Sequence, residues 1–590
     1  MLPVPSPPAG VSLVAIEAGV TLLSILIALF WPRIASKPLA SAERWFTRLA
    51  RRRAVGVLTV GIAAGVLRLS IIPWAPIPQP FIHDEFSYLL AADTFASGRL
   101  TNPTHPMWRY LEGFHITQQP TYMSMYFPAQ GLVLAAGRVL LGHTWYGVLI
   151  STALMCSAIC WMLQGWLPPR WALLGGWLAV LRLALFSYWI NMYYGGAVAA
   201  IGGCLVLGAL PRLIRSLRIR DGLVMALGAI LLANSRPYEG VLVCLPVACR
   251  LLWWAARETY FGSWILVRRM LAPAALLLGA AGFMAYYDYR VFGDVFTLPY
   301  QVNRATYAVA PVFLWQAPKP EPQYRYQTMR NFYTKWELGD FQRARSLPGF
   351  VNATAQKLGV VLVFYFGIAL MPPLIALPCV FRDRRMRFLV ISAGVYCIGL
   401  SANAWLFPHY AAPFVGGLYA MLLQAMRHLR VWSRRSHPSG LLLVRVIPLI
   451  CIALAGVRLF ADRTNVRTGR WPTVSMWYGM QPVGLARARI ATELDAHAGR
   501  HLAIVRYTAA HLPFDDWVYN KADIDNSKIV WARESETGSN SELLQYFHDR
   551  NIWLVEPDCN PPKLSRYGAG KLEPASAPKD SPANSARTGD

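Results

Sequence analysis

Two carboxylates stand next to each other at Asp84 and Glu85, directly after an apolar run and with His83 before them. A carboxylate that reaches hydrogen-bond distance of a hydroxyl group can take its proton as a general base. Asp84 could instead be the N-cap of a helix expected from Glu85 to Ala96, where its carboxylate would accept backbone N–H groups. The residue types alone leave both roles open.

Several cationic and aromatic side chains in other polar segments could bind an anionic substrate. Arg holds phosphate through planar, paired hydrogen bonds, which makes it a good partner for a negatively charged group. The candidates for contacts with a phosphate or substrate are Arg109, Arg236, Arg304, His409, Tyr410 and Tyr126. Arg236 could also be an arginine that reaches the membrane interface, and His409 with Tyr410 an aromatic anchor there.

The sequence contains no established metal-binding spacing. Eight of the nine cysteines lie in apolar runs and Cys559 stands alone near the C-terminus, without a CxxC or Cys/His pattern. Neither a zinc site nor a disulfide framework is therefore predicted. Asp84 and Glu85 could together bind a divalent cation. His83 could be a ligand, a partner of the acid pair or a solvated loop residue.

The composition indicates which elements must position these residues. The hydrophobic fraction is 55%, the charged fraction 15% and the mean hydropathy +0.33, which excludes a soluble domain and a disordered chain. A membrane-spanning helix needs about 20 mostly apolar residues. About twelve such spans are predicted, at 11–31, 54–74, 143–167, 171–190, 193–211, 222–235, 239–254, 270–287, 358–381, 388–406, 411–428 and 441–460.

The net charge of +26 comes from basic clusters between the apolar runs, which favours a membrane topology over binding to nucleic acid. Alternate threading of the spans places the clusters on one side, at 48–53, 212–220, 266–269, 382–387 and 427–435. By the positive-inside rule this side is the cytoplasm. The other side receives 75–130, 187–196, 234–240, 288–357, 407–413 and everything after 460. All the candidate residues lie in these outward segments.

Four parts of the chain are predicted. Residues 1–53 hold a basic linker and an extra spanning helix, which is expected to be retained rather than cleaved as a signal peptide. Residues 54–460 form the main transmembrane domain, with a first outer loop at 75–130. Residues 461–565 form an extracytoplasmic α/β domain, and residues 566–590 are disordered. The third part has predicted strands at 501–507, 527–534 and 551–557 and a helix at 541–550, which favours parallel pairing.

Three smaller features complete these expectations. The segment 128–142 is expected to be a surface helix or a half-span. The segment 511–525, rich in acids and aromatic residues, is expected to be a solvated loop, although it would also suit a carbohydrate. Asp93 is expected to be solvated, because it lies about two and a half helical turns after Asp84.

Three motifs, in this order, resemble one family of membrane enzymes. HDEFSYLLAADTFASGRL (83–100) resembles the Asp-Glu first outer loop of GT-C glycosyltransferases, in the branch of protein mannosyltransferases, aminoarabinose transferases and RgtA/B/C/D-like proteins. QQPTYMSMYFPAQG (118–131) resembles the Lys-Tyr-Pro-Pro or Lys-Pro-Pro element of that branch, and FPHYAAPFVGGLYA (407–420) its late (His/Arg)-Tyr…Pro element. The resemblance covers roughly 75–430. One departure is that MYFP (125–128) lacks the lysine.

The resemblance and the predicted spans together imply an α-helical polytopic membrane protein, GT-C-like with about 12 transmembrane helices. The small C-terminal soluble α/β domain lies outside the resemblance and is predicted from its own pattern of strands and helices. The resemblance also implies a hexosyl- or pentosyltransferase that moves a sugar from a polyprenyl-phosphate donor to an envelope glycan, lipid or protein. Asp84 would be the general base, Glu85 would orient the acceptor or Asp84, and the cations would stabilise the departing lipid phosphate.

The remaining implications concern cofactors, partners and location. The resemblance implies catalysis without a metal or other cofactor. The predicted spans imply membrane lipids among the partners, and the position of the basic clusters argues against nucleic acid. The location would be the plasma (inner) membrane of a bacterium, with the active site and the C-terminal domain on the periplasmic side.

Two other classes of function compete with this interpretation. Twelve spans suit a transporter or lipid flippase, but no internal repeat relates the two halves and nearly all the acids lie in loops. A non-catalytic membrane scaffold with the C-terminal part as a partner-binding module is the second alternative, and it predicts that Asp84 is dispensable.

Overall fold

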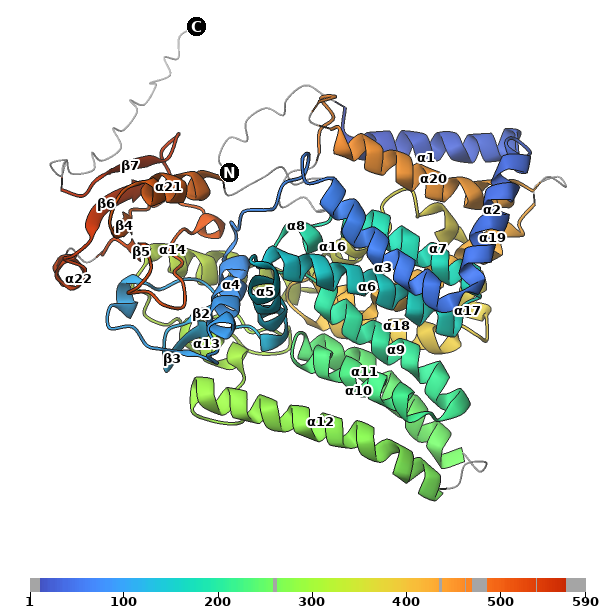
Figure 1. The fold of residues 1–590 in the computed structure, drawn as a ribbon, viewed down its shortest axis with the longest axis horizontal. Helices are drawn as coiled ribbons and strands as arrows, with labels where there is room; N and C mark the ends of the chain where they lie inside the picture. Colours follow the sequence, from blue (N-terminus) through green and yellow to red (C-terminus); the bar gives the residue numbers. More distant parts are fainter. Residues whose placement is uncertain are drawn as a thin grey trace, which may run out of the picture.

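The computed structural model describes residues 11–257, 263–433, 438–461, 463–468, 485–536 and 539–568. It shows a multi-pass helical bundle with a small sheet at one end (Figure 1). Most of the predicted disordered segment, from 569 onwards, and the last two residues of the basic cluster 427–435 lie outside the described residues.

Eight helices among the described residues are long and apolar enough to cross a membrane. They are α1 (Leu13–Phe30), α3 (Arg53–Ser70), α6 (Trp145–Trp166), α9 (Ala197–Ser216), α11 (Pro237–Arg257), α12 (Ser263–Phe292), α16 (Leu347–Tyr365) and α20 (Ser439–Leu459). A ninth span is formed if the bent pair Pro372–Arg382 and Arg387–Ala402, which meets at 111°, counts as one. That pair contains η4 (Pro372–Ala376), α17 (Leu377–Arg382) and α18 (Arg387–Ala402).

The predicted number of about twelve spans is therefore too high by this measure. The predicted spans 171–190, 222–235 and 411–428 fall on shorter helices. These are α7 (Pro169–Ala179), continued by the π-helix η2 (Val180–Ala184), α10 (Ile219–Ala233) and α19 (Val415–Arg430). The predicted span 358–381 is interrupted after Tyr365, because Gly367 has a left-handed φ of +60° and two prolines follow at 372 and 373.

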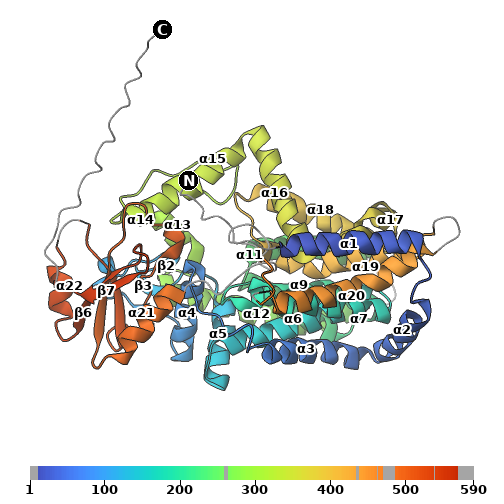
Figure 2. The ribbon, with the colours of Figure 1, turned by 90° about the horizontal axis from the view of Figure 1, so that it is seen from above.

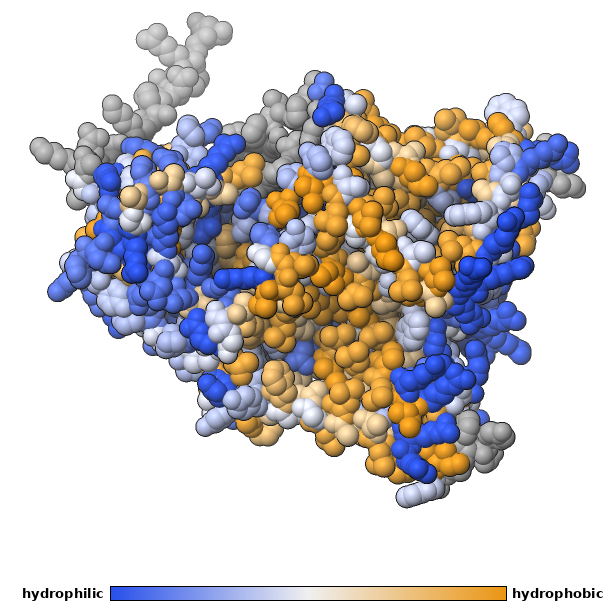
Figure 3. Space-filling model, viewed as in Figure 1, coloured by the Kyte–Doolittle hydropathy of each residue, from blue (hydrophilic) through white to orange (hydrophobic). Residues whose placement is uncertain are grey.

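The surface divides into an apolar belt between two hydrophilic ends (Figure 3). The basic helix α2 (Ser36–Arg51) lies at one end, and the C-terminal sheet lies at the other (Figures 1 and 2). The predicted surface helices are present at the sheet end as α4 (His83–Ala96) and α5 (Pro128–Leu141). Basic and outward segments thus lie at opposite ends of the bundle, as the threading predicts.

The C-terminal part forms the predicted parallel pairing. Its strands are β4 (His501–Val505), β5 (Ile529–Arg533), β6 (Asn551–Glu556) and β7 (Lys563–Arg566), in the order β5-β4-β6-β7. The central strand β4 is parallel to both neighbours, while β7 adds an antiparallel edge that the sequence pattern did not predict. The helices α21 (Leu485–Ala496) and α22 (Ser541–Tyr546) accompany the sheet.

The first outer loop and the C-terminal sheet share one hydrophobic core. The loop contains a small antiparallel sheet of β1 (Asn102–Pro103), β2 (Ile116–Thr117) and β3 (Thr121–Ser124), and the single turn η1 (Trp108–Tyr110). Phe86 of α4 stacks on Tyr519 with ring centroids 4.3 Å apart. Leu90 and Tyr122 belong to the same buried cluster as Leu502 of β4. The predicted boundary at 460 stays a prediction, but the two parts pack as one unit.

Asp93 takes part in this packing, so its predicted solvation is wrong. Its Oδ2 accepts a hydrogen bond from the backbone N–H of Ala522 at 2.7 Å, and its Oδ1 pairs with Arg138 of α5. The carboxylate ties α4 to the C-terminal part of the chain. Its direction away from Asp84 agrees with the helical spacing.

The remaining outer elements cover the sheet end of the bundle. Two of them come from residues 188–191 and 299–307, and the others come from 327–345, 408–414 and 513–515. They are α8 (Tyr188–Asn191), α13 (Pro299–Tyr307), α14 (Gln327–Arg330), the π-helix η3 (Asn331–Glu337), α15 (Leu338–Arg345), η5 (Pro408–Phe414) and η6 (Pro513–Asp515). Several of these short pieces contribute to the cavity described below.

Gly203 of α9 allows the close approach of η5. A Cβ at this position would lie far inside contact distance of the carbonyl oxygen of Pro413. Gly203→Ala should therefore push α9 and η5 apart and lower the free energy of unfolding by about 1–3 kcal/mol, the usual cost of overpacking. The midpoint of thermal unfolding in detergent measures this change.

Gly279→Ala on α12 is the matched control, because nothing lies within 4 Å of a Cβ there. Its unfolding midpoint should stay the same or rise, since Ala favours a helix over Gly. Equal midpoints for the two variants would contradict the close packing of α9 against η5.

Candidate active site

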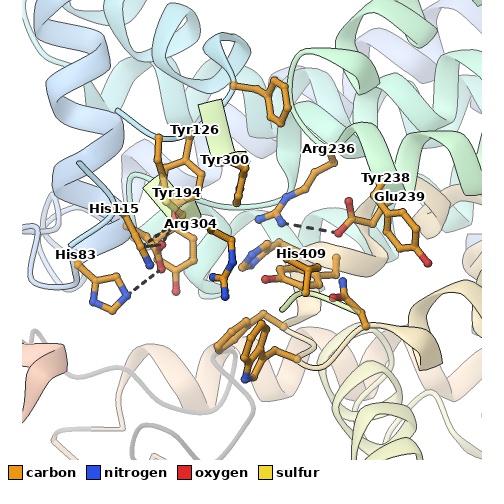
Figure 4. Close-up of a pocket in the computed structure, with 18 of the residues that line it drawn as sticks. His83, His115, Tyr126, Tyr194, Arg236, Tyr238, Glu239, Tyr300, Arg304 and His409 are labelled. Atoms are coloured by element: carbon orange, nitrogen blue, oxygen red, sulfur yellow. Dashed lines mark hydrogen bonds and ion pairs between the residues drawn. The ribbon is translucent and has the colours of Figure 1, made fainter. Parts of the chain in front are cut away.

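A cavity of about 340 Å³ lies at the sheet end of the bundle, within the size range of small-molecule sites. Segments far apart in the sequence build it: the start of α4, the loop after β3, the α10–α11 turn, α13, η3, η5 and η6. Figure 4 shows the cationic, acidic and aromatic side chains that converge on it. Its charged and imidazole-bearing lining residues are His83, Asp84, His115, Arg236, Glu239, Arg304, Glu337 and His409.

Asp84 faces this cavity and is held by two partners on one oxygen. His115 Nδ1 lies 2.9 Å from Asp84 Oδ1, and the Tyr126 hydroxyl donates a hydrogen bond to the same oxygen. Its other oxygen lies 3.8 Å from His83 Nε2, beyond hydrogen-bond distance. The side chain keeps 22% of its surface exposed, so Oδ2 is available to a ligand in the cavity.

The environment favours the ionised form of Asp84. Burial alone would raise the pKa of its carboxyl group. The neighbouring His83 and His115 and the hydrogen bonds from His115 and Tyr126 outweigh burial and hold this pKa below its ordinary value. Burial, with His115 nearby, lowers the pKa of His83 to about 3. His83 is therefore neutral at pH 7.

Glu85 points away from the cavity and holds the start of α4. Its Oε2 accepts hydrogen bonds from the backbone N–H groups of Phe81 (2.9 Å) and Ile82 (3.2 Å), and its Oε1 accepts one from Tyr193 (3.1 Å). The carboxyl group is fully buried, and burial raises its pKa to about 7. Adjacent helical residues diverge by about 100°, so one acid of the pair had to face elsewhere.

The structure therefore separates the two roles that the sequence left open for Asp84: Glu85 binds the backbone at the start of α4, and Asp84 faces the cavity. Ile82 is the N-cap residue, and the side chain of Glu85 accepts its backbone N–H, so Asp84 is not the cap. The catalytic role predicted for Glu85 finds no support in this geometry, because its two oxygens are occupied by backbone donors and it does not line the cavity.

Arg236 and Arg304 both reach the cavity but differ in how strongly they are held. Arg304 donates to both carboxylate oxygens of Glu337, at 3.1 and 3.0 Å, and to the carbonyl oxygen of Ala310. Arg236 lies 3.8 Å from Glu239, too far for a hydrogen bond, and its guanidinium is 4.5 Å from the centroid of the Tyr410 ring. Arg236 is therefore the cation with more hydrogen-bonding capacity for an anion.

His409 and Tyr410 enter the same cavity from η5. His409 Nδ1 lies 2.7 Å from the hydroxyl of Tyr188, which also accepts the backbone N–H of His409. Burial and the charge of Arg236 hold the pKa of His409 well below its ordinary value, so its ring is neutral. The structure thus brings six of the predicted residues together: Asp84, Tyr126, Arg236, Arg304, His409 and Tyr410.

Arg109 is the second predicted residue that the structure keeps out of the cavity. It lies on η1 and is exposed, and its carbonyl oxygen accepts a hydrogen bond from Tyr326. The first outer loop places its neighbours Met107 and Leu111 in the core shared with the C-terminal sheet. Arg109 is turned to solvent by that packing, so its predicted phosphate contact is not supported.

Some lining residues escaped the sequence interpretation. His115 has a left-handed φ of +59°, and its carbonyl oxygen accepts a hydrogen bond from Ser87 at 2.6 Å. In the sequence, only the position of His115 in the first outer loop could have indicated that it belongs to the site. Phe514, within the predicted loop 511–525, reaches the cavity from the C-terminal part, with its ring 5.7 Å from that of His83 and 4.9 Å from that of Trp336.

One group of side chains in the cavity has the chemistry of a metal site. Ligand atoms of His83, Asp84 and His115 lie within 4.8 Å of one another, the single such group of three among the described residues. Two imidazoles with one carboxylate suit zinc and similar ions better than magnesium or calcium. In the present arrangement His115 and Tyr126 share one oxygen of Asp84 through hydrogen bonds.

Comparison with protein-family models finds no match, and comparison with curated proteins finds none either. Among solved structures, the chain is similar to the oligosaccharyltransferase of Archaeoglobus fulgidus, crystallised with Zn and sulfate, at 12% identity and a TM-score of 0.46 over 85% of this chain and 67% of that one. AglB from the same organism, in complex with an inhibitory peptide and a dolichol-phosphate, is similar at 11% identity and a TM-score of 0.45, over 85% and 69%.

ArnT from Cupriavidus metallidurans in the apo state is similar at 14% identity and a TM-score of 0.44, over 85% of this chain and 93% of that one.

The different roles of the two acids predict different effects on stability. Glu85→Ala would leave three backbone N–H groups without their acceptor, two of them in buried residues, so it should lower the free energy of unfolding by about 1–3 kcal/mol or more. Asp84→Asn keeps an acceptor for His115 or Tyr126 and should change the thermal midpoint little. A larger loss for Asp84→Asn than for Glu85→Ala would contradict these assignments.

Proposed function

We propose that this chain is an integral membrane glycosyltransferase that moves a sugar from a polyprenyl-phosphate donor to an acceptor hydroxyl. The observation that carries the proposal is the convergence of one ionised carboxylate, Asp84, and the cation Arg236 on a cavity at the end of the bundle opposite the basic loops. A base and a phosphate-binding cation are the two groups that such a transfer requires.

Asp84 would act as the general base. The acceptor hydroxyl would donate a hydrogen bond to Oδ2, the oxygen that neither His115 nor Tyr126 holds. As the sugar leaves its phosphate through an oxocarbenium-like transition state, the hydroxyl oxygen bonds to the anomeric carbon and its proton passes to Asp84. His115 and Tyr126 fix the carboxylate and keep it ionised before the acceptor arrives.

The departing lipid phosphate needs stabilisation of charge more than a proton. Arg236 would supply it, with Arg304 nearby and the neutral His409 and Tyr410 as hydrogen-bonding partners. Met125, Tyr126 and Phe127 of the MYFP element line the same cavity. Arg236 would therefore stand in for the lysine that this element lacks.

The aromatic wall formed by Phe332, Trp336 and Phe514 would accommodate the acceptor. Aromatic faces stack well on the apolar faces of sugar rings, and the wall borders His83 at the Asp84 side of the cavity. Envelope glycans, glycolipids or proteins remain the candidate acceptors. The basic loops would lie in the cytoplasm and the cavity on the periplasmic side of a bacterial inner membrane.

We also propose that transfer proceeds without a metal. A cation between His83, Asp84 and His115 would compete with the hydrogen bonds that His115 and Tyr126 make to Asp84. It would also occupy the oxygen on which the proton transfer depends.

Asp84→Asn tests the proposed base. The variant should lower sugar transfer from radiolabelled polyprenyl-phosphate donors by at least about a hundredfold, because an amide cannot take the proton. The assay uses membranes that hold equal amounts of folded protein. Asp93→Asn is the matched control, since it changes an acid on the same helix that faces the C-terminal part, and it should retain transfer.

Two outcomes would count against the proposal. Undiminished transfer by Asp84→Asn would remove this residue from the mechanism. Absence of transfer by the wild type with every donor tested would favour the transporter or scaffold alternatives.

His115→Ala should shift the pH dependence of transfer. Only the ionised Asp84 can accept a proton, so activity falls as the pH drops through its pKa. His115 helps to hold this pKa below its ordinary value, and its removal raises the pKa. The acid limb of the kcat/KM profile should therefore move to higher pH than in wild type.

His511→Ala provides the control for this measurement. Its Nδ1 also lies near a carboxylate oxygen, 2.7 Å from Asp558, but it is not part of the cavity. An acid limb that stays in place in His115→Ala, or that moves equally in both variants, would show that His115 does not tune Asp84.

A further inference from the structure

A second cavity, of about 670 Å³, runs along the membrane-facing side of the bundle, away from the Asp84 site. Its walls come from α3 and α20 and its floor from α7 and η2, while α2 and the end of α19 line it at the basic end of the molecule. Figures 1 and 2 both show α2 crossing this end of the bundle, opposite the C-terminal sheet.

The long part of this groove is apolar. Leu67 of α3, Leu178 of α7 and Ile452 of α20 line it, and Ile452 keeps 55% of its surface exposed. The groove lies within the apolar belt, where hydrocarbon rather than water fills a recess between helices. Its shape and lining therefore suit an extended acyl chain.

The basic end of the groove carries an excess of positive charge. Arg170, Arg430 and Arg445 line it together with one acid, Glu43. Glu43 accepts from Arg430 at 2.7 Å and from Arg445 at 2.8 Å, so a single carboxylate serves two guanidinium groups. Three arginines against one carboxylate leave two positive charges at the mouth of an apolar groove.

We propose that this groove binds one anionic phospholipid from the leaflet on the basic side. Its phosphate and its net negative charge would lie beside the three arginines, and one acyl chain would run between α3 and α20. Basic pockets between transmembrane helices on the cytoplasmic side are the usual places where anionic headgroups bind. The excess charge is what selects an anionic lipid over a zwitterionic one.

The site is separate from the proposed transfer reaction. It shares no lining residue with the cavity of Asp84, and it opens at the opposite end of the bundle. A bound lipid would join α2 to α7 and α20, in addition to the ion pairs of Glu43 with Arg430 of α19 and Arg445 of α20.

Native mass spectrometry of the full chain, purified in detergent and titrated with phosphatidylglycerol or phosphatidylcholine, tests the proposal. The wild type should bind one phosphatidylglycerol at least about fivefold more tightly than phosphatidylcholine. Arg170→Gln should weaken phosphatidylglycerol binding about fivefold, the effect of one basic side chain at a membrane surface. Arg384→Gln, an exposed arginine outside the groove, is the control and should leave binding unchanged.

A second variant fills the groove without disturbing the fold. Gly456 of α20 lines it, and nothing lies within 4 Å of a Cβ there, so Gly456→Phe can extend into the groove. It should abolish the one-to-one lipid complex, whereas Gly282→Phe on α12, also open, should not. Thermal midpoints verify that both variants are folded.

Four results would overturn the proposal. They are equal binding of the two phospholipids, tighter binding of a polyprenyl phosphate than of phosphatidylglycerol, unchanged binding in Gly456→Phe, and a second copy of the chain in place of the lipid.

Discussion

Three backbone N–H groups converge on the buried carboxylate of Glu85, and the geometry of the cavity depends on this contact. It fixes the first turn of α4 through Phe81 and Ile82 and joins it to Tyr193, 108 residues later in the chain. Since the first turn of α4 is fixed and adjacent helical residues diverge by about 100°, Asp84 points away from Glu85 and into the cavity. An acidic pair is needed here because one acid holds the backbone while the other meets the ligand.

Charge balance is the second constraint on the cavity. Each arginine that enters it has an acid nearby, Glu337 for Arg304 and Glu239 for Arg236, as burial of a charge requires. The two pairs differ in strength: the Arg304 pair is bidentate, while the Arg236 pair is longer than a hydrogen bond. The cavity is thus electrostatically stable when empty and still offers one cation to an incoming anion.

Sequence patterns predicted the features that follow from local chemistry. Hydrophobic runs and basic clusters gave the spans and their sidedness, and β-branched runs between turn residues gave three of the four C-terminal strands. The patterns did not give the π-helix η2 after α7 or the break at Gly367, although that glycine and the two prolines after it are local signals, so the predicted number of spans was too high. Residue types in outward loops identified six cavity residues. They could not separate Asp84 from Glu85, exclude Arg109 or find His115, because backbone hydrogen bonds and packing with distant segments decide those positions.

The core shared by the first outer loop and the C-terminal sheet has a consequence for biosynthesis. Phe86 and Leu90 emerge from the ribosome early, whereas Tyr519 and the strands that cover them follow much later; the bond between Asp93 and Ala522 spans 429 residues. Until then the loop presents an unpaired apolar face and the cavity lacks Phe514. The cavity is therefore closed last, so a chain interrupted anywhere in the membrane domain cannot form the complete pocket.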